Sequence, residues 1–267
     1  MKKEVLVVIS VALVVIIVGC GLWLGWYALD SHHQKEAFAG LSQEFVLEEP
    51  TAPDEQPAES NTAEGEASTV TLAVSDPNIP SRHDLAALQA ENSDCVGWLT
   101  IPDTTVDYPV VWTPNNPEHY LRRDFYGNSA SGGTPFLDGR NEAQAKGQNL
   151  IVYGHNMLDG SMFKPVLQYL TPNFQVTHED IYLELNGTQY HYQVIAALET
   201  NTRSPVYTYT DLSDTAEMED FRAMLLEETG LDAIPQAEGY LTLSTCNDQG
   251  GNSRVLVVAV LVGKQEI

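Results

Sequence analysis

The hydrophobic pattern begins with one long uncharged run, Val5–Leu29, which follows two lysines at the N-terminus. As a helix rising about 1.5 Å per residue, such a run spans a hydrocarbon core of about 30 Å. Trp23 and Trp26 lie near its far end, where aromatic rings suit a membrane interface, and the lysines favour a cytoplasmic N-terminus. We therefore expect residues 1–30 to form a cytoplasmic end and a single transmembrane anchor.

A cleaved signal peptide is the alternative explanation of this run. The sequence Ile17-Val-Gly-Cys20 is similar to a bacterial lipoprotein processing site, with Cys20 as the lipidated residue. The apolar run continues past Cys20 to Leu29, whereas a signal peptide gives way to polar sequence. This favours an uncleaved anchor, and both alternatives leave the rest of the chain outside the cell and tethered to the membrane.

Residues 31–80 lack the pattern of a packed domain. The part from residue 48 onward is rich in Glu, Pro, Ala, Ser and Thr, so it cannot bury enough apolar surface to offset its ordering entropy. We expect an acidic extracellular linker here, with weaker patterns for a helical extension over His32–Leu47 and a short strand over Val70–Val74. It is either a self-repelling spacer that holds the following domain off the bilayer or a tolerated disordered tail.

Residues 81–267 have the pattern of one β-rich domain. Short stretches rich in β-branched and aromatic residues, separated by turn residues, predict eight strands. They are Val96–Ile101, Val106–Trp112, Thr134–Leu137, Asn149–Gly154, Asp180–Leu185, Thr188–Leu198, Tyr240–Cys246 and Arg254–Val262. This pattern favours a closed barrel or a sandwich, and Asn186-Gly187 predicts a two-residue hairpin turn between the fifth and sixth strands.

Three helices are predicted within this domain. Asp84–Asn92 precedes the first strand, and Ser161–Leu170 carries apolar residues at helical spacing. Thr215–Thr229 begins after the capping residue Asp214 and ends before Gly230. This last helix is inserted between the sixth and seventh strands.

The composition excludes some classes of function. The chain has 267 residues, and its 37 acidic against 13 basic residues give a formal net charge of −24, which argues against a nucleic-acid partner. Its three cysteines form no metal-type C-x-x-C spacing. Only Cys95 and Cys246 could form a disulfide within the domain, and the pattern does not favour one.

Three residues near strand ends suggest a chemical site. Cys246 closes the seventh strand and Arg254 opens the eighth, so a short loop brings a thiol close to a guanidinium that favours thiolate or holds an oxyanion. His155 directly follows an apolar strand and a glycine, and it can serve as the base that a thiol nucleophile needs. Each residue alone is more often structural, and it is the combination that indicates catalysis.

These segments resemble those of the sortase family. Thr242-Leu-Ser-Thr-Cys246 matches the sortase signature Thr-Leu-x-Thr-Cys, and the arginine eight residues later and Tyr153-Gly-His155-Asn match the sortase arginine and histidine segments. The resemblance runs from about residue 84 to the end. The helical insertion before the seventh strand, the segment from Val96 to Asp138, and Asp248 resemble class B sortases.

The resemblance implies an eight-stranded sortase-type β-barrel with peripheral helices and the activity of a cysteine transpeptidase. Cys246 would attack a C-terminal sorting signal of an exported protein, His155 would transfer protons and Arg254 would hold the oxyanion. The thioester would be resolved by an amine of the cell wall of a Gram-positive bacterium, with no metal or cofactor. Leu121, Tyr207, Ser244, Thr245 and Asp248 are the candidate substrate-binding residues.

Three alternatives stay open at this stage. A pilus-assembling sortase would use a pilin lysine as the amine, and a hydrolytic cysteine peptidase would use the same residues with water as the acceptor. A membrane-anchored binding module would not need Cys246 at all.

Overall fold

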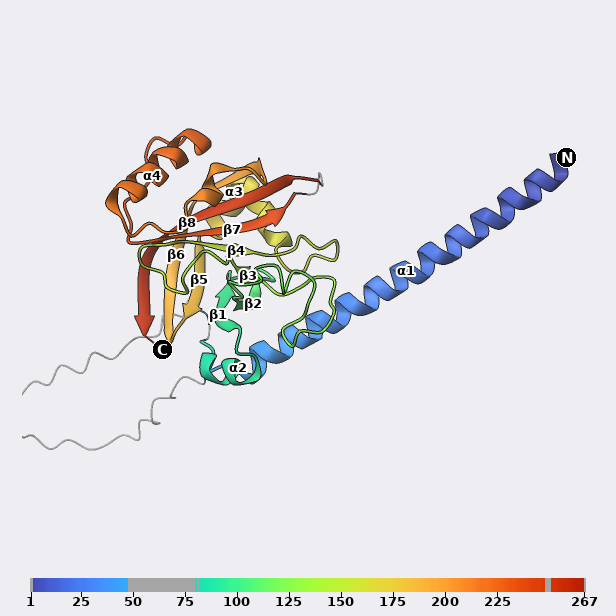
Figure 1. Ribbon diagram of the computed structural model, residues 1–267, viewed down its shortest axis with the longest axis horizontal. Coiled ribbons are helices and arrows are strands. Elements are labelled where there is room, and N and C mark those ends of the chain that lie inside the picture. Colours follow the sequence, from blue (N-terminus) through green and yellow to red (C-terminus); the bar gives the residue numbers. More distant parts are fainter. Residues whose placement is uncertain (1, 48–79, 81, 248–250, 267) are drawn as a thin grey trace, which may run out of the picture.

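The domain folds into a closed β-barrel in the strand order β1-β2-β3-β4-β7-β8-β6-β5, as Figure 1 shows. The computed structural model describes residues 2–47, 80, 82–247 and 251–266. The strands are β1 (Cys95–Thr100), β2 (Asp107–Val111), β3 (Phe136–Leu137), β4 (Asn149–Tyr153), β5 (Asp180–Leu185), β6 (Thr188–Asn201), β7 (Tyr240–Cys246) and β8 (Ser253–Glu266). The predicted eight-stranded barrel is therefore confirmed, and the sandwich is not.

Two pairings at β7 determine where the site lies. Strands β4 and β7 are parallel, with Asn149 opposite Tyr240 and Tyr153 opposite Ser244. Because parallel strands end at the same edge of a sheet, the residues that follow Tyr153 emerge beside the end of β7. Strands β7 and β8 are antiparallel, with Cys246 directly opposite Arg254.

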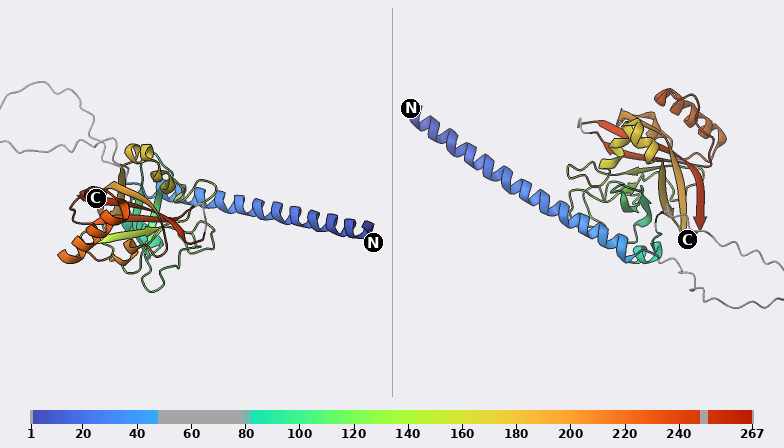
Figure 2. Two further views of the ribbon diagram at one scale, coloured as in Figure 1. Left: turned by 90° about the horizontal axis from the view of Figure 1, so that it is seen from above. Right: turned by 180° about the vertical axis from the view of Figure 1, so that it is seen from behind.

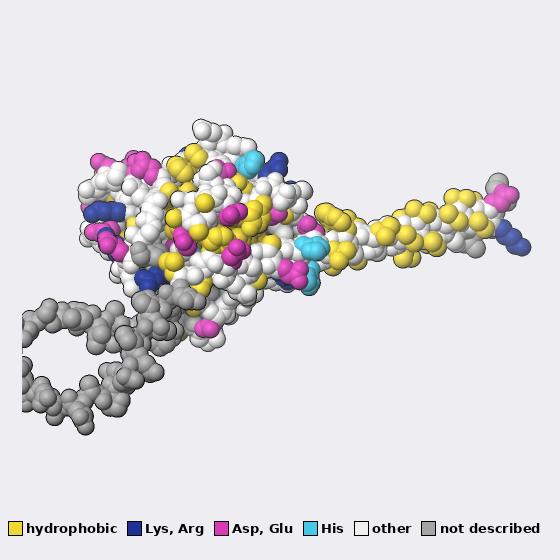
Figure 3. Space-filling model, turned by 90° about the horizontal axis from the view of Figure 1, so that it is seen from below, with side chains coloured by type: hydrophobic (Ala, Val, Ile, Leu, Met, Phe, Trp, Pro, Cys, Tyr) yellow, Lys and Arg dark blue, Asp and Glu magenta, His cyan; other side chains and the backbone are white. Residues whose placement is uncertain are grey.

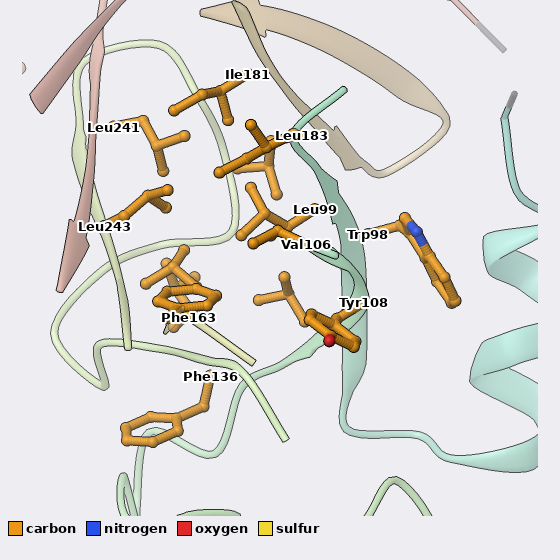
Figure 4. Packing of buried hydrophobic residues seen from close by; sticks show 14 of the residues in the cluster. Trp98, Leu99, Val106, Tyr108, Phe136, Phe163, Ile181, Leu183, Leu241 and Leu243 are labelled. Carbon is orange, nitrogen blue, oxygen red and sulfur yellow. The ribbon is translucent and has the colours of Figure 1, made fainter. Parts of the chain in front are cut away.

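The interior of the barrel is filled by alternating side chains of the strands. Figure 4 shows Leu99, Leu183, Leu241 and Leu243 gathered inside, whereas Trp98 points away from them. Alternation along a strand explains this, because successive side chains point to opposite faces. Trp98 is nevertheless fully buried, since its ring stacks on His83 with centroids 3.9 Å apart outside the barrel.

A second apolar cluster covers the outer face of β6, β7 and β8. It is formed by α4 (Thr215–Thr229), which turns Phe221 and Leu225 toward Tyr240 and its neighbours. The Asp214 side chain caps the first turn and Gly230, with φ 67°, ends the helix in the left-handed conformation that favours glycine. The predicted insertion between the sixth and seventh strands is thus confirmed.

Helix α1 (Lys2–Glu44) is a single uninterrupted helix that projects from the domain in both views of Figure 2. Its first part is long and apolar enough to cross a membrane, and Figure 3 shows its hydrophobic side chains exposed along the projecting rod. Its last turns behave differently, because Phe38 and Leu41 are buried in the main core. The helical extension expected over His32–Leu47 is confirmed as far as Glu44, but this segment is partly core and not only linker.

The far end of α1 lies against the start of the domain. Leu47 donates its N–H to the Arg82 carbonyl at 2.7 Å, and Asp84 donates to the Phe45 carbonyl at 2.7 Å. The acidic segment between Leu47 and Pro80 therefore starts and finishes at the same place. Its role as a spacer stays a prediction, and the strand expected over Val70–Val74 lies outside the described residues.

The smaller differences from the predicted elements have local causes. Strand β3 begins only at Phe136 because Pro135 has no N–H to donate. The helix predicted over Ser161–Leu170 is instead the 3-10 helix η1 (Lys164–Leu170), since Met162 has a φ of 54° that no right-handed helix accepts. The expected helix over Asp84–Asn92 is α2 (Leu85–Glu91). Two short elements were not predicted, α3 (Pro172–Thr177) and η2 (Pro205–Thr208).

Candidate active site

A cavity of about 450 Å³ lies where β4 and β7 end and β8 begins, and Cys246, His155 and Arg254 all line it. The structure thus brings together the three residues that the sequence singled out, although 91 positions separate His155 from Cys246. The parallel β4–β7 pair brings the first two to one edge, and the β7–β8 register adds the third.

Cys246 lies on the outer face of the barrel. Leu241 and Leu243 point into the core, so Thr242, Ser244 and Cys246 face the opposite side. Cys246 is half-buried and its thiol is free. Cys95 is also free but fully buried, and burial raises its pKa to about 12, so it is not a competing nucleophile.

His155 is held by one hydrogen bond of its ring and one of its backbone carbonyl. Its Nε2 lies 2.7 Å from the Leu121 carbonyl oxygen, which can only accept, so this bond places the proton on Nε2 and leaves Nδ1 as the basic nitrogen. The His155 carbonyl accepts from the Phe163 N–H at 2.8 Å. A side chain at Gly154 would collide with the Phe163 ring, so only glycine permits this approach.

The surroundings of His155 favour the neutral imidazole. Burial is the main cause that lowers its pKa from the ordinary value of 6.5, and the positive charge of Arg122 acts in the same direction. The bond to the Leu121 carbonyl opposes them without reversing the shift. A neutral histidine beside a thiol can accept the thiol's proton.

Three hydrogen bonds fix the histidine segment to the cysteine strand. Gly154 N–H donates to the Ser244 carbonyl at 3.1 Å, and the Thr245 hydroxyl donates to the Gly154 carbonyl at 2.8 Å. The Asn156 amide donates to the Cys246 carbonyl at 3.1 Å. The backbone positions of His155 and Cys246 are therefore set by direct bonds rather than by a flexible loop.

The Arg254 guanidinium is oriented by the loop before it. Its Nη1 donates to the Ser253 carbonyl at 2.8 Å and to the Gly251 carbonyl at 3.1 Å. Among the described residues these bonds use Nη1 alone, so the other N–H groups of the fork remain for a ligand. A fixed guanidinium on the same face as a thiol can bind an oxyanion as it forms.

One wall of the cavity is an aromatic stack. Phe136 and Tyr153 stack with ring centroids 5.3 Å apart, and Tyr153 and Tyr207 with centroids 6.1 Å apart. The Tyr153 hydroxyl donates to Asp138 at 2.8 Å, and Asp138 also pairs with Arg140 at 2.7 Å. All five residues line the cavity. Tyr207 was among the site residues named from the sequence, whereas Phe136, Asp138, Arg140 and Tyr153 were not. The sequence signal that could have identified Tyr153 is its position at the end of β4, two residues before His155.

The proposed substrate-binding residues occupy different places. Leu121, Tyr207, Ser244 and Thr245 line the cavity. The hydroxyls of Tyr207 and Ser244 lie 2.8 Å apart, and Thr245 is buried and bound to Gly154. Asp248 lies outside the described residues.

Comparisons with a family model and with curated relatives point to the same protein family. The sortase domain family model matches residues 99–262. Sortase B of Listeria monocytogenes is 34% identical over 201 residues, which cover 73% of this chain and 81% of the relative. Sortase B of Staphylococcus aureus is 30% identical over 190 residues, which cover 68% of this chain and 75% of the relative.

Solved structures similar to this one come from the same family as the related sequences. The Staphylococcus aureus sortase B–substrate complex matches with a TM-score of 0.59 and 30% identity, over 67% of this chain and 84% of that one. Sortase B from Bacillus anthracis in complex with AAEK2 matches with a TM-score of 0.66 and 27% identity, over 88% of this chain and 98% of that one.

Proposed function

Because this chain belongs to the sortase family and is a cysteine transpeptidase, we propose that Cys246, His155 and Arg254 carry out its chemistry. The observation that supports this assignment most strongly is the parallel β4–β7 pair, which delivers a histidine and a cysteine to one cavity opposite an arginine. The first half-reaction forms a bond between the Cys246 sulfur and the threonine carbonyl carbon of a sorting signal.

Proton transfer follows from the state of His155. As the sulfur–carbon bond forms, the thiol proton passes to Nδ1 of the neutral imidazole, and the carbonyl oxygen becomes an oxyanion that Arg254 binds. The resulting imidazolium then protonates the departing amine, the peptide bond breaks, and a thioester remains on Cys246. An incoming amine attacks the thioester carbonyl carbon and gives its proton to His155. The carbon–sulfur bond then breaks, the product leaves as a new amide, and the imidazolium returns the proton to the Cys246 sulfur, which regenerates the thiol.

The substrates are surface proteins that carry a C-terminal sorting signal, and the acceptor is an amine of a cell-wall precursor. One structural relative is a Staphylococcus aureus sortase B–substrate complex, which supports the binding of a substrate by this chain as well. Leu121, Tyr207, Ser244, Thr245 and Asp248 contact the signal in this proposal. Helix α1 crosses the membrane once with its N-terminus in the cytoplasm, so that the barrel works outside the cell.

The test uses the full chain in detergent, because Phe38 and Leu41 of α1 belong to the core. The protein is incubated with a panel of sorting-motif peptides, with and without an added amine, and the products are followed by mass spectrometry. We expect a thioester on Cys246 and an amide product that increases with amine concentration. Cys246→Ala is the control.

Three results would change this assignment. The absence of any adduct on Cys246 with every peptide would falsify the transpeptidase chemistry proposed for it. Release of the free acid at a rate that does not respond to the amine would instead identify a hydrolytic peptidase. Preference for a lysine side chain of a pilin over a cell-wall amine would identify pilus assembly.

A further inference from the structure

The last turns of α1 present one stripe of side chains to the domain. Ser31, Gln34, Lys35 and Phe38, here called the docking stripe, follow the i, i+3, i+4, i+7 spacing of one helix face. Ser31, Gln34 and Phe38 are at least nine-tenths buried, whereas the residues between them are exposed. The stripe begins just two residues after the apolar run, so it connects the anchor to the domain without a hinge.

One half of the docking stripe binds the loop that follows His155. Lys35 Nζ lies 2.8 Å from the Asp159 carboxylate and donates to the Asp159 carbonyl at 3.2 Å. Ser31 donates a hydrogen bond to the same carboxylate. Burial alone would raise the pKa of Asp159, but the bonds from Lys35, Ser161 and Ser31 outweigh it and hold that pKa well below its ordinary value. The carboxylate is therefore charged and firmly held.

Asp159 in turn shapes the loop whose base carries His155. It accepts hydrogen bonds from the N–H and hydroxyl of Ser161 at 3.1 and 2.6 Å. The loop closes where Asn156 bridges Met162 and where Phe163 N–H donates to the His155 carbonyl at 2.8 Å. A displacement of Asp159 would therefore also displace the residues that flank His155.

The other half of the docking stripe binds the segment behind the acceptor of His155. Gln34 accepts from the Gly132 N–H at 2.9 Å and donates to the Gly133 carbonyl at 3.3 Å. Gly133 lies so close to Leu121 that an added Cβ would be 2.5 Å from the Leu121 carbonyl oxygen. That oxygen is the acceptor of His155 Nε2. The same helix face thus supports both the loop and the hydrogen-bond acceptor of His155.

We propose that the docking stripe of α1 is a positioning element for His155, with Lys35 and Gln34 as positioning residues that couple the membrane anchor to the active site. This inference rests on the proposed role of His155 as the proton-transfer group. It assigns to the juxtamembrane helix a part in the reaction itself, beyond that of a tether. Without the docking stripe, the barrel would keep its three reactive residues but would hold the imidazole of His155 less firmly.

The central experiment compares Lys35→Met with a matched control, Lys146→Met, in the full chain. Lys146 also forms an ion pair with a carboxylate, 3.7 Å from Glu238, but this pair is exposed and includes no residue of α1. We expect Lys35→Met to lower kcat about 10-fold with a smaller change in KM, because even about 1 Å of misplacement of a reacting group costs up to about 100-fold. Lys146→Met should match the parent.

Two readouts separate positioning from a general loss of structure. The acidic limb of the kcat–pH profile should move to higher pH in Lys35→Met, since a loosened loop admits water and relieves the burial that lowers the pKa of His155. Amide hydrogen exchange should accelerate in residues 155–163 and not elsewhere in the barrel. Lys35→Arg should keep most of the activity, and the exchanged pair Lys35→Asp with Asp159→Lys should recover part of it.

The outcomes distinguish this inference from the proposed function. Full activity in His155→Ala would overturn the proposed function and with it the premise. If His155→Ala and Cys246→Ala are inactive but Lys35→Met and Gln34→Ala keep the parent's kcat, pH profile and exchange rates, the positioning role is wrong and the function stands. Loss of activity in Lys35→Met without a shift of the pH profile or local exchange would also contradict positioning.

Discussion

Gly154→Ala tests whether the end of β4 is packed as tightly as the structure indicates. A Cβ on residue 154 would lie 2.5 Å from Cγ of Phe163, whereas carbon atoms prefer about 3.5–4.0 Å. The Phe163 ring is completely buried, with 0% exposed, so it has no free space into which to retreat by about 1 Å. Overpacking of this kind costs about 1–3 kcal/mol, which for a domain of this size lowers Tm by about 2–12 °C.

The same substitution should impair the reaction. Gly154 is bonded through its N–H to Ser244 and through its carbonyl to Thr245, so a backbone that yields to relieve the clash also moves His155. A shift of about 1 Å in a reacting group costs up to about 100-fold in rate. We therefore expect both Tm and kcat/KM to fall.

The assay is thermal unfolding by near-ultraviolet circular dichroism, combined with kcat/KM for transpeptidation, on the full chain in detergent. Gly263→Ala is the matched control in a strand, because its nearest neighbour, Cβ of His191, is 3.8 Å away and an added methyl fits. Adding Phe163→Leu to Gly154→Ala should recover part of the loss by making room. A Gly154→Ala protein with the Tm and kcat/KM of the parent would refute the packing argument.

Three further predictions concern the cavity. Arg254→Lys keeps the charge but loses the planar fork, so kcat should fall about 10²–10³-fold, and an unchanged kcat would remove the guanidinium from oxyanion binding. Arg122→Gln removes a charge that lowers the pKa of His155, so the acidic limb of the rate–pH profile should move to higher pH; a limb that stays in place would contradict this electrostatic coupling. Tyr207→Phe and Ser244→Ala remove the two partners of a 2.8 Å bond, and a double-mutant cycle in urea should show about 1 kcal/mol of coupling in the free energy of unfolding. Zero coupling would show that this bond contributes nothing in solution.

The parts of the fold that were predictable are those determined by neighbours in sequence. Asn186-Gly187 fixed the β5–β6 hairpin, with both residues at positive φ and Leu185 opposite Thr188, as the dipeptide requires. The full length of β6 and β8 was not predictable, because the ends of each strand are stabilised by pairing with the other strand. Their pairing runs from Thr188 opposite Glu266 to Asn201 opposite Ser253, and no local pattern contains both partners.

The active site likewise has a part that could be predicted from local sequence and a part that could not. The thiol, imidazole and guanidinium were identified together because Cys246 ends a strand, Arg254 begins one and His155 follows one, each strand having a clear β pattern. The hydrogen bond from His155 to the Leu121 carbonyl could not be predicted from the sequence. Leu121 was named for its side chain, and because every residue has a backbone carbonyl, no sequence pattern identifies the one that accepts. The aromatic wall formed by Phe136, Tyr153 and Tyr207 depends on three elements that only the closed barrel brings together.

The juxtamembrane part of α1 shows most clearly why the remainder could not be predicted. Its buried face includes the polar residues Ser31 and Gln34, so the hydrophobic pattern of this segment is weak, and their partners Asp159, Gly132 and Gly133 lie about 100 positions or more away. Without knowledge of these distant partners, the sequence of this segment cannot be told apart from that of a linker. The structure shows continuous helix from the apolar part of α1 to the domain, and it brings Leu47 and Arg82, at the two ends of the acidic segment, together at one point of the domain. Shortening the acidic segment should therefore leave the distance from membrane to active site unchanged, and cutting one turn from α1 should not.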